Sequence, residues 1–500
     1  MARHPRRCSE VANFRMKAFA IRWIKRLAIV VLLAMVSLVG VRMYDAQRKP
    51  PLGPWHTYVP AEMHAHELDR ATWGDYVAHE DSLIDAVRKN VTDKLTPDER
   101  VAANRYFAGS PVFPGHFRTD WNRSYTLAPQ GTPRGVAVML HGLTDSPYSL
   151  RHIAERYQRD GFFVVAIRLP GHGTVPSSLT DVTAEDWEAA TRLAVREARR
   201  RVPAPAPLHV VGFSNGGALA LEYSLEALQD PHLPQADRLV LLSPMIGITR
   251  FARFAGLAAL PSVLPAFAKA AWLDIVPEFN PFKYNSFPVN GARQSWLVTQ
   301  KIQQEVTQAA RRGQLDSLPP VLTFQSVLDF TVSTSAIISS LYAQLPANGS
   351  ELVLFDINRT TQLNPLVRAS MRDALRRLAP VPPLRYRFTV LTNASSASSL
   401  VVEESTAPNS TATTVKPTGL DYPAEVYSLS HVALPFPESD SLYGRTPDPN
   451  DDLGVHLGAQ SIRGETGGLI VGAGTLTRLS WNPFFAYIVA RIDHLTGTSP

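Results

Sequence analysis

Residues 208–221 read LHVVGFSNGGALAL, and this stretch decides the fold. A short buried strand over 208–212 runs directly into a G-x-S-x-G pattern centred on Ser214, and a helix of small residues follows at once. Glycines flank the serine because a turn this tight brings larger side chains against neighbouring backbone. The pattern alone also occurs by chance at ordinary turns, but the strand–turn–helix context favours a serine nucleophile raised above a sheet.

Strands alternate with helices on both sides of this turn. The expected strands cover 135–140, 162–168, 208–212, 239–242, 321–326, 352–357 and 385–392, and the expected helices cover 146–160, 184–201, 215–228 and 481–496. Such alternation predicts an α/β fold with a mostly parallel central sheet and helices on both faces.

The alternation is interrupted between residues 247 and 317, where the sequence is helical and apolar and later amphipathic. This interruption predicts an inserted helical lid. The whole chain then divides into a basic leader with a hydrophobic segment (1–44), a stalk and N-terminal helical region (45–118), the first part of the core (119–246), the lid (247–317) and the second part of the core (318–500). A stretch rich in Ser, Thr and Ala at 393–420 is expected to be a surface loop or an edge hairpin.

The net charge of +6 does not describe the body of the protein. Residues 1–26 contain one acidic residue, Glu10, and eight basic ones, namely Arg3, Arg6, Arg7, Arg15, Lys17, Arg22, Lys25 and Arg26. This leader carries +7, so the rest of the chain sums to −1. A basic leader on a neutral body argues against a nucleic-acid partner.

The leader continues into residues 27–41, LAIVVLLAMVSLVGV, which contain no charged residue. A membrane span usually needs about 20 apolar residues, so this run fits a signal-peptide core or a short anchor. The preceding positive charges predict that the body crosses the membrane. Since no clean cleavage site follows, we expect membrane anchoring with the body on the extracytoplasmic (periplasmic) side, or secretion if the leader is cleaved.

The sequence offers no metal site and calls for no cofactor. Its single cysteine, Cys8, lies in the leader, so no disulfide within the chain and no CxxC motif can form. His64 and His66 lie near Glu62, but side chains two apart on a helix do not face each other.

A second element of the expected chemistry follows the strand 135–140, where the sequence reads His141-Gly-Leu-Thr-Asp145. An acyl-transfer site needs two N–H groups directed at the developing oxyanion. One would come from Asn215, directly after Ser214, and the other from Leu143 in this loop. The alternative is an ordinary glycine turn at the end of a strand.

Three motifs, His141-Gly-Leu-Thr, Arg168-Leu-Pro-Gly-His-Gly173 and Gly212-Phe-Ser-Asn-Gly216, together resemble the α/β-hydrolase superfamily. The resemblance is greatest to the branch of monoacylglycerol lipases and serine aminopeptidases. It is clear over about 120–245 and extends over 318–435. It implies an α/β-hydrolase fold, a catalytic order Ser, Asp, His, and a structural role for His172 beside the site.

For the acid, the resemblance implies Asp329, which follows the strand VLTFQS and precedes a small–valine pair, or Asp356, which also ends an apolar strand. Asp329 is preferred because its strand comes directly after the lid. For the base, His431 is preferred over His456, because a short apolar segment precedes it and a proline turn follows. Asp329 and His431 are 102 residues apart, so an insertion at about 345–420 is expected between them.

These residues predict a serine-dependent carboxylic ester hydrolase that forms an acyl-enzyme on Ser214. The apolar lid favours a lipid or lipophilic ester, although an apolar helix can also be simple packing. A serine peptidase or amidase of the same fold would use identical residues. A non-catalytic binding protein of this fold is the third interpretation.

Overall fold

The computed structural model describes residues 6–247, 265–329, 331–360, 373–424, 426–451, 453–458 and 481–498. Within them a ten-stranded sheet has the order β1-β3-β2-β4-β5-β8-β9-β10-β11-β12. Its strands are β1 (Tyr125–Leu127), β2 (Gly135–Leu140), β3 (Phe162–Ile167), β4 (Leu208–Phe213), β5 (Arg238–Leu242), β8 (Val321–Ser326), β9 (Glu351–Phe355), β10 (Arg387–Ser395), β11 (Ser398–Thr406) and β12 (Thr413–Asp421). The strands from β3 to β10 pair in parallel, and β1, β11 and β12 pair antiparallel at the two edges.

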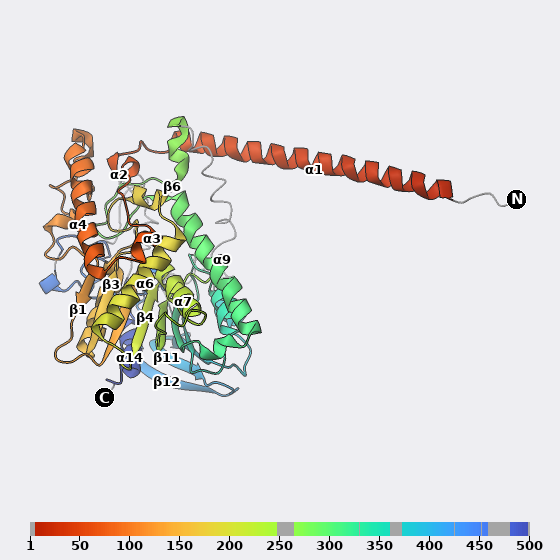
Figure 1. The fold of residues 1–500 in the computed structure, drawn as a ribbon. Coiled ribbons are helices and arrows are strands. Elements are labelled where there is room, and N and C mark those ends of the chain that lie inside the picture. Colours follow the sequence, from red (N-terminus) through yellow and green to blue (C-terminus); the bar gives the residue numbers. More distant parts are fainter. Residues whose placement is uncertain are drawn as a thin grey trace.

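Helices surround this sheet and join its strands (Figure 1). They are α1 (Arg6–Arg48), α2 (Pro54–Thr57), α3 (Ala65–Leu68), α4 (Trp73–Asn90), α5 (Arg151–Arg159), α6 (Ala184–Arg201), α7 (Asn215–Ala227), α9 (Val289–Arg311), α10 (Thr334–Ala336), α12 (Ala374–Leu378) and α14 (Phe485–Thr496).

Alternate residues of β2 show which helices cover which face, because successive side chains of a strand point to opposite sides. Val136 and Val138 join a core with side chains of α6, α7 and α9. Ala137 and Met139 join a second core with side chains of α5 and α14. The predicted α/β-hydrolase fold, a mostly parallel sheet with helices on both faces, is therefore confirmed.

The chain between Asp329 and His431, where an insertion at about 345–420 is expected, extends the sheet. β9 and β10 continue it in parallel, and β11 and β12 form the edge hairpin that the Ser/Thr/Ala-rich stretch predicts. Residues 361–372 lie outside the described ranges. The segment between Asp329 and His431 thus contains the strands β9 to β12. At His431 the chain returns to the carboxyl end of β8.

The region of the expected lid is described only in part, since residues 248–264 fall outside the described ranges. After them come a 3₁₀ segment, Pro265–Ala271, and a two-stranded sheet of β6 (Trp272–Asp274) and β7 (Phe287–Pro288). Helix α9 packs its apolar face, including Val298 and Ile302, on the core beneath. The lid itself stays a prediction.

Helix α1 projects away from the rest of the molecule and meets it at its carboxyl end (Figure 1). There Lys49 donates to the carbonyl of Trp272 over 2.6 Å, and Lys269 donates to the carbonyl of Lys49 over 2.7 Å. None of the described helices is long and apolar enough to cross a membrane. The membrane anchor and the extracytoplasmic location stay predictions.

The region that follows α1 is attached to the core by a buried ion cluster. The Arg168 guanidinium, after β3, binds Glu62 over 2.9 and 3.0 Å and Glu80 of α4 over 3.1 Å. Tyr76 of α4 donates to the carbonyl of Arg168 over 2.5 Å. All four side chains are buried. The cluster therefore makes this N-terminal region part of the folded core.

We expect Arg168→Met to lower the free energy of unfolding by about 3–5 kcal/mol, because two buried carboxylates lose their counter-ion. Urea unfolding at neutral pH measures this change. Arg88→Met is the matched control, since the Arg88–Asp85 pair on α4 is exposed and such pairs contribute about 0–1 kcal/mol. Equal stability of the two variants would contradict the prediction.

Candidate active site

Ser214 lies on the turn between β4 and α7, in a conformation that L-residues rarely adopt, with φ +55° and ψ −116°. The flanking glycines make this turn possible. A Cβ on Gly212 would lie 2.3 Å from the carbonyl oxygen of Gly216, and a Cβ on Gly216 would lie 1.9 Å from that of Leu140. The structure thus gives the steric reason for the G-x-S-x-G pattern.

Three of the predicted residues meet at this turn. The Oγ of Ser214 lies 2.9 Å from Nε2 of His431, and Nδ1 of His431 lies 2.9 Å from Oδ2 of Asp329. With the Nδ1–H tautomer, His431 donates to the carboxylate and accepts from the serine. Residues 102 and 217 positions apart therefore form one continuous hydrogen-bond chain.

The Asp329 carboxylate is held from its other side by backbone. Its Oδ1 accepts the N–H groups of Thr331 and Val332, each over 2.8 Å. Burial by itself would raise the pKa of Asp329, but the adjacent His431 and the hydrogen bonds outweigh burial and lower this pKa. The group is therefore an anion at neutral pH, as the partner of an imidazole must be.

The alternative acid, Asp356, and the alternative base, His456, each contact other residues. Asp356, after β9, accepts from Arg359 over 2.8 Å and from Thr392 over 2.9 Å. His456 contacts the carbonyl of Ser441 through Nδ1 over 2.9 Å. Among the described contacts, neither reaches Ser214, so the geometry favours the preferred pair.

The loop after β2 lies beside the serine. A Cβ on Gly142 would approach Cβ of Ser214 to 3.2 Å, and Thr144 has a positive φ of 63°. Among the described residues, neither the Leu143 nor the Asn215 backbone N–H donates a hydrogen bond. Both amides are thus available to a ligand, and their oxyanion role stays a prediction.

The histidines of the two neighbouring loops are structural. His141 accepts from the Leu169 N–H through Nε2, over 3.0 Å, which ties the two loops together. Burial lowers the pKa of His172 to about 3, so this ring stays neutral. Within the described ranges, no group of three or more His, Cys, Asp or Glu side chains could hold a metal ion.

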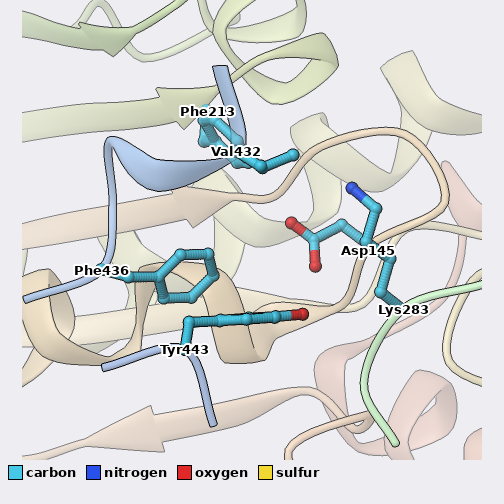
Figure 2. Close-up of a pocket in the computed structure, with 6 residues that line it drawn as sticks. All are labelled: Asp145, Phe213, Lys283, Val432, Phe436 and Tyr443. Carbon is cyan, nitrogen blue, oxygen red and sulfur yellow. The ribbon is translucent and has the colours of Figure 1, made fainter. Parts of the chain in front are cut away.

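A pocket opens next to His431, and its residues were not predicted from the sequence. It is lined by Asp145, Phe213, Lys283, Val432, Phe436 and Tyr443. Figure 2 shows the Asp145 carboxylate directed into the space between Val432 and the rings of Phe436 and Tyr443, with the Lys283 ammonium beside the carboxylate and pointing away from the two rings. Burial raises the pKa of Asp145 against the opposing effect of Lys283. Aromatic residues shortly after His431 were the one available signal.

The segment after His431 is tied to α5 by a buried polar cluster. Asp440 accepts from Tyr148 over 2.9 Å, from Arg151 over 3.1 Å and from His152 over 2.9 Å. Asp440 is fully buried. This cluster holds Phe436 and Tyr443 against the core, so the pocket wall is fixed by the first half of the domain.

Comparison with known proteins relates a part of the chain that includes Ser214 and Asp329, but not His431, to hydrolases. Residues 131–356 match the family model of serine aminopeptidase, S33. The thermostable monoacylglycerol lipase of Bacillus sp. (strain H-257) is 36% identical over 89 residues, which are 18% of this chain and 34% of that protein. The match thus spans about a third of that relative's length.

Solved structures with a similar arrangement include lipolytic enzymes. A structure for the metagenome-derived LipS and LipT is 23% identical and covers 47% of this chain and 88% of its own, with a TM-score of 0.36. A soluble variant of monoglyceride lipase from Saccharomyces cerevisiae is 14% identical and covers 46% and 81%, with a TM-score of 0.37.

The parallel sheet, the serine turn and the family match define the class of this protein: it contains an α/β-hydrolase domain. Within that superfamily, the domain is related to the branch of monoacylglycerol lipases and serine aminopeptidases. The resemblance drawn from the three sequence motifs is therefore confirmed.

We expect Gly216→Ala to disrupt the serine turn, because its Cβ would collide with the Leu140 carbonyl. The loss of stability should reach about 3 kcal/mol or more, measured by urea unfolding. In the control Gly74→Ala, at an exposed position of α4, the nearest atom to the new Cβ is 3.7 Å away. That change should be neutral or stabilise by up to about 1 kcal/mol. A Gly216→Ala protein of wild-type stability would refute the steric account.

Proposed function

We propose that this protein is a serine hydrolase that cleaves carboxylic esters through an acyl-enzyme on Ser214. The observation that carries the proposal is the hydrogen-bond chain from Ser214 through His431 to Asp329. A serine hydroxyl is a weak nucleophile unless an adjacent base removes its proton, and this chain supplies such a base and an anion to orient it.

In the proposed mechanism, His431 Nε2 takes the Ser214 proton as Oγ attacks the ester carbonyl. Asp329 holds the imidazole in the required tautomer and stabilises its charged form. The Leu143 and Asn215 N–H groups bind the oxyanion. His431 then gives the proton to the leaving alcohol, and a water activated by the same nitrogen releases the acid.

The proposed substrate is a lipid or lipophilic ester. The rings of Phe213 and Phe436 and the side chain of Val432 form an apolar wall beside His431, and Asp145 and Lys283 form a polar end. We infer that this wall would contact the apolar part of an ester bound at Ser214 and that the polar end would contact a polar part of it, such as a hydroxyl. The name of the related Bacillus monoacylglycerol lipase supports the same substrate class.

The alternative is a peptidase or amidase of the same fold, which the description of the matching family supports. Aminoacyl p-nitroanilides offered beside p-nitrophenyl esters separate the two activities. A non-catalytic binding protein is disfavoured, because such a protein has no need of an assembled Ser–His–Asp chain.

We expect a fluorophosphonate probe to label the wild type and not Ser214→Ala. Asp329→Asn should lower kcat for p-nitrophenyl esters by about 10⁴-fold, because the imidazole loses its orienting anion. The matched controls Asp356→Asn and His456→Gln should keep kcat within about threefold, since both residues lie in other contacts. Absence of labelling in folded wild-type protein would favour the binding-protein interpretation, and a large loss in either control would move the catalytic assignment.

We expect Phe436→Ala to enlarge the pocket and to shift the preference of the enzyme towards bulkier esters. The ratio of kcat/KM between p-nitrophenyl octanoate and acetate should rise by about 10-fold, the equivalent of 1–2 kcal/mol of differential binding. Phe388→Ala is the control, because this side chain is buried in the core on the other side of the sheet. If the ratio in Phe436→Ala is unchanged, the pocket does not bind the acyl part of the substrate.

A further inference from the structure

Gln325 is fully buried near the end of β8, four residues before Asp329, and its amide reaches the carboxylate. Its Nε2 donates to Asp329 Oδ2 over 3.1 Å. The same oxygen lies 2.9 Å from Nδ1 of His431. Two donors thus share one carboxylate oxygen, and any change at Gln325 acts directly on the acid that orients the base.

The orientation of this amide follows from its surroundings. Besides Asp329, the same end of Gln325 contacts the carbonyl of Ser326 over 3.3 Å and Thr334 Oγ1 over 3.0 Å. Thr334 gives its own hydrogen to the Ser326 carbonyl over 3.0 Å, so its oxygen can only accept from Gln325. All three neighbours are therefore acceptors, and only the NH₂ end of the amide fits there.

The oxygen of the Gln325 side-chain amide, Oε1, is buried and accepts no hydrogen bond from the described residues. A buried acceptor without a partner destabilises the fold, and an apolar side chain of similar size would avoid this cost. The benefit of a glutamine at position 325 therefore lies in the hydrogen bonds that its Nε2 donates, above all the one to Asp329.

The next residue connects the same strand end to the base. Ser326 Oγ donates to the carbonyl of Leu429 over 2.9 Å, two residues before His431. The end of β8 thus contacts the acid through Gln325 and the histidine loop through Ser326. The relative position of Asp329 and His431 depends on this one strand end.

We propose that Gln325 is a positioning residue of the active site, whose Nε2 holds the Asp329 carboxylate in the orientation that receives the His431 Nδ1–H. The inference rests on the proposed serine hydrolase function and extends it. In the described contacts Gln325 does not touch the residues that line the pocket, and Asp329 is the one catalytic candidate that it contacts.

The test begins with Gln325→Met, which keeps the length of the side chain and removes the donor. We expect kcat for p-nitrophenyl acetate to fall by about 10-fold or more, with KM unchanged, as for other residues that orient a catalytic ligand. Rates are normalised to the number of fluorophosphonate-reactive sites, so unfolded protein does not count. The matched control is Gln294→Met, at a buried glutamine of α9 that hydrogen-bonds Ala184 and Asn290; its kcat per site should stay at the wild-type value.

Gln325→Glu supplies a readout that a purely structural role would not change. The introduced carboxyl group, when protonated, would donate to Asp329 as the amide does, and two buried carboxylates this close share one proton. As the pH rises from about 6 to 9 this proton leaves, the two anions repel, and orientation is lost. The kcat ratio of Gln325→Glu to Gln325→Met should therefore rise as the pH falls, and the titratable groups in this contact are Asp329 and its partner His431.

The outcomes separate this inference from the proposed function. If the wild type takes no label, the proposed function fails and the inference fails with it. If the wild type is labelled and Gln325→Met keeps its kcat within about twofold, Gln325 is not a positioning residue. If Gln325→Met does not fold, the kcat ratio of Gln325→Glu to the wild type replaces it: a ratio that does not change with pH overturns the proposal, and a ratio that rises as the pH falls supports it.

Discussion

The site depends on a steric constraint at one turn. A Cβ at Gly212 or Gly216 would overlap backbone carbonyls. Because glycine has no Cβ, the chain can pass from β4 into α7 without an intervening loop. That abrupt passage forces Ser214 into a positive φ and places its hydroxyl at the carboxyl end of the sheet. Every other part of the proposed site is arranged around an oxygen whose position backbone packing decides.

The parallel sheet brings distant residues to that oxygen, since the carboxyl ends of parallel strands meet at one edge. Asp329 follows β8, two strands from β4 in the sheet, and His431 returns to the same edge after β9 to β12. The added strands lengthen the sheet sideways and leave this edge unchanged. A separation of 102 residues is thereby compatible with a contact of 2.9 Å.

The pocket depends on contacts between segments that are far apart in the chain. Its lining comes from the loop after β2, the end of β4, the segment before β7 and the chain after His431. Buried polar contacts hold these segments: Arg105 of the N-terminal region donates to the carbonyls of Asn280 and Lys283, and Asp440 is bound by α5. Substrate selection would therefore depend on parts of the chain that lie outside the G-x-S-x-G core, including residues before β1.

The sequence by itself determined the alternation of strands and helices and the serine turn, whereas the order of the three catalytic candidates was implied by the family resemblance. The alternation and the turn are local, because side-chain period and glycine sterics act over a few residues. It left Asp329 and Asp356, and His431 and His456, as alternatives. It contained no sign of the Arg168 cluster or of the Gln325 contacts, and only the aromatic residues after His431 hinted at the pocket. Only the tertiary structure brings these residues into contact, because a hydrogen bond between residues far apart in the chain depends on strand order and register, which no local pattern encodes.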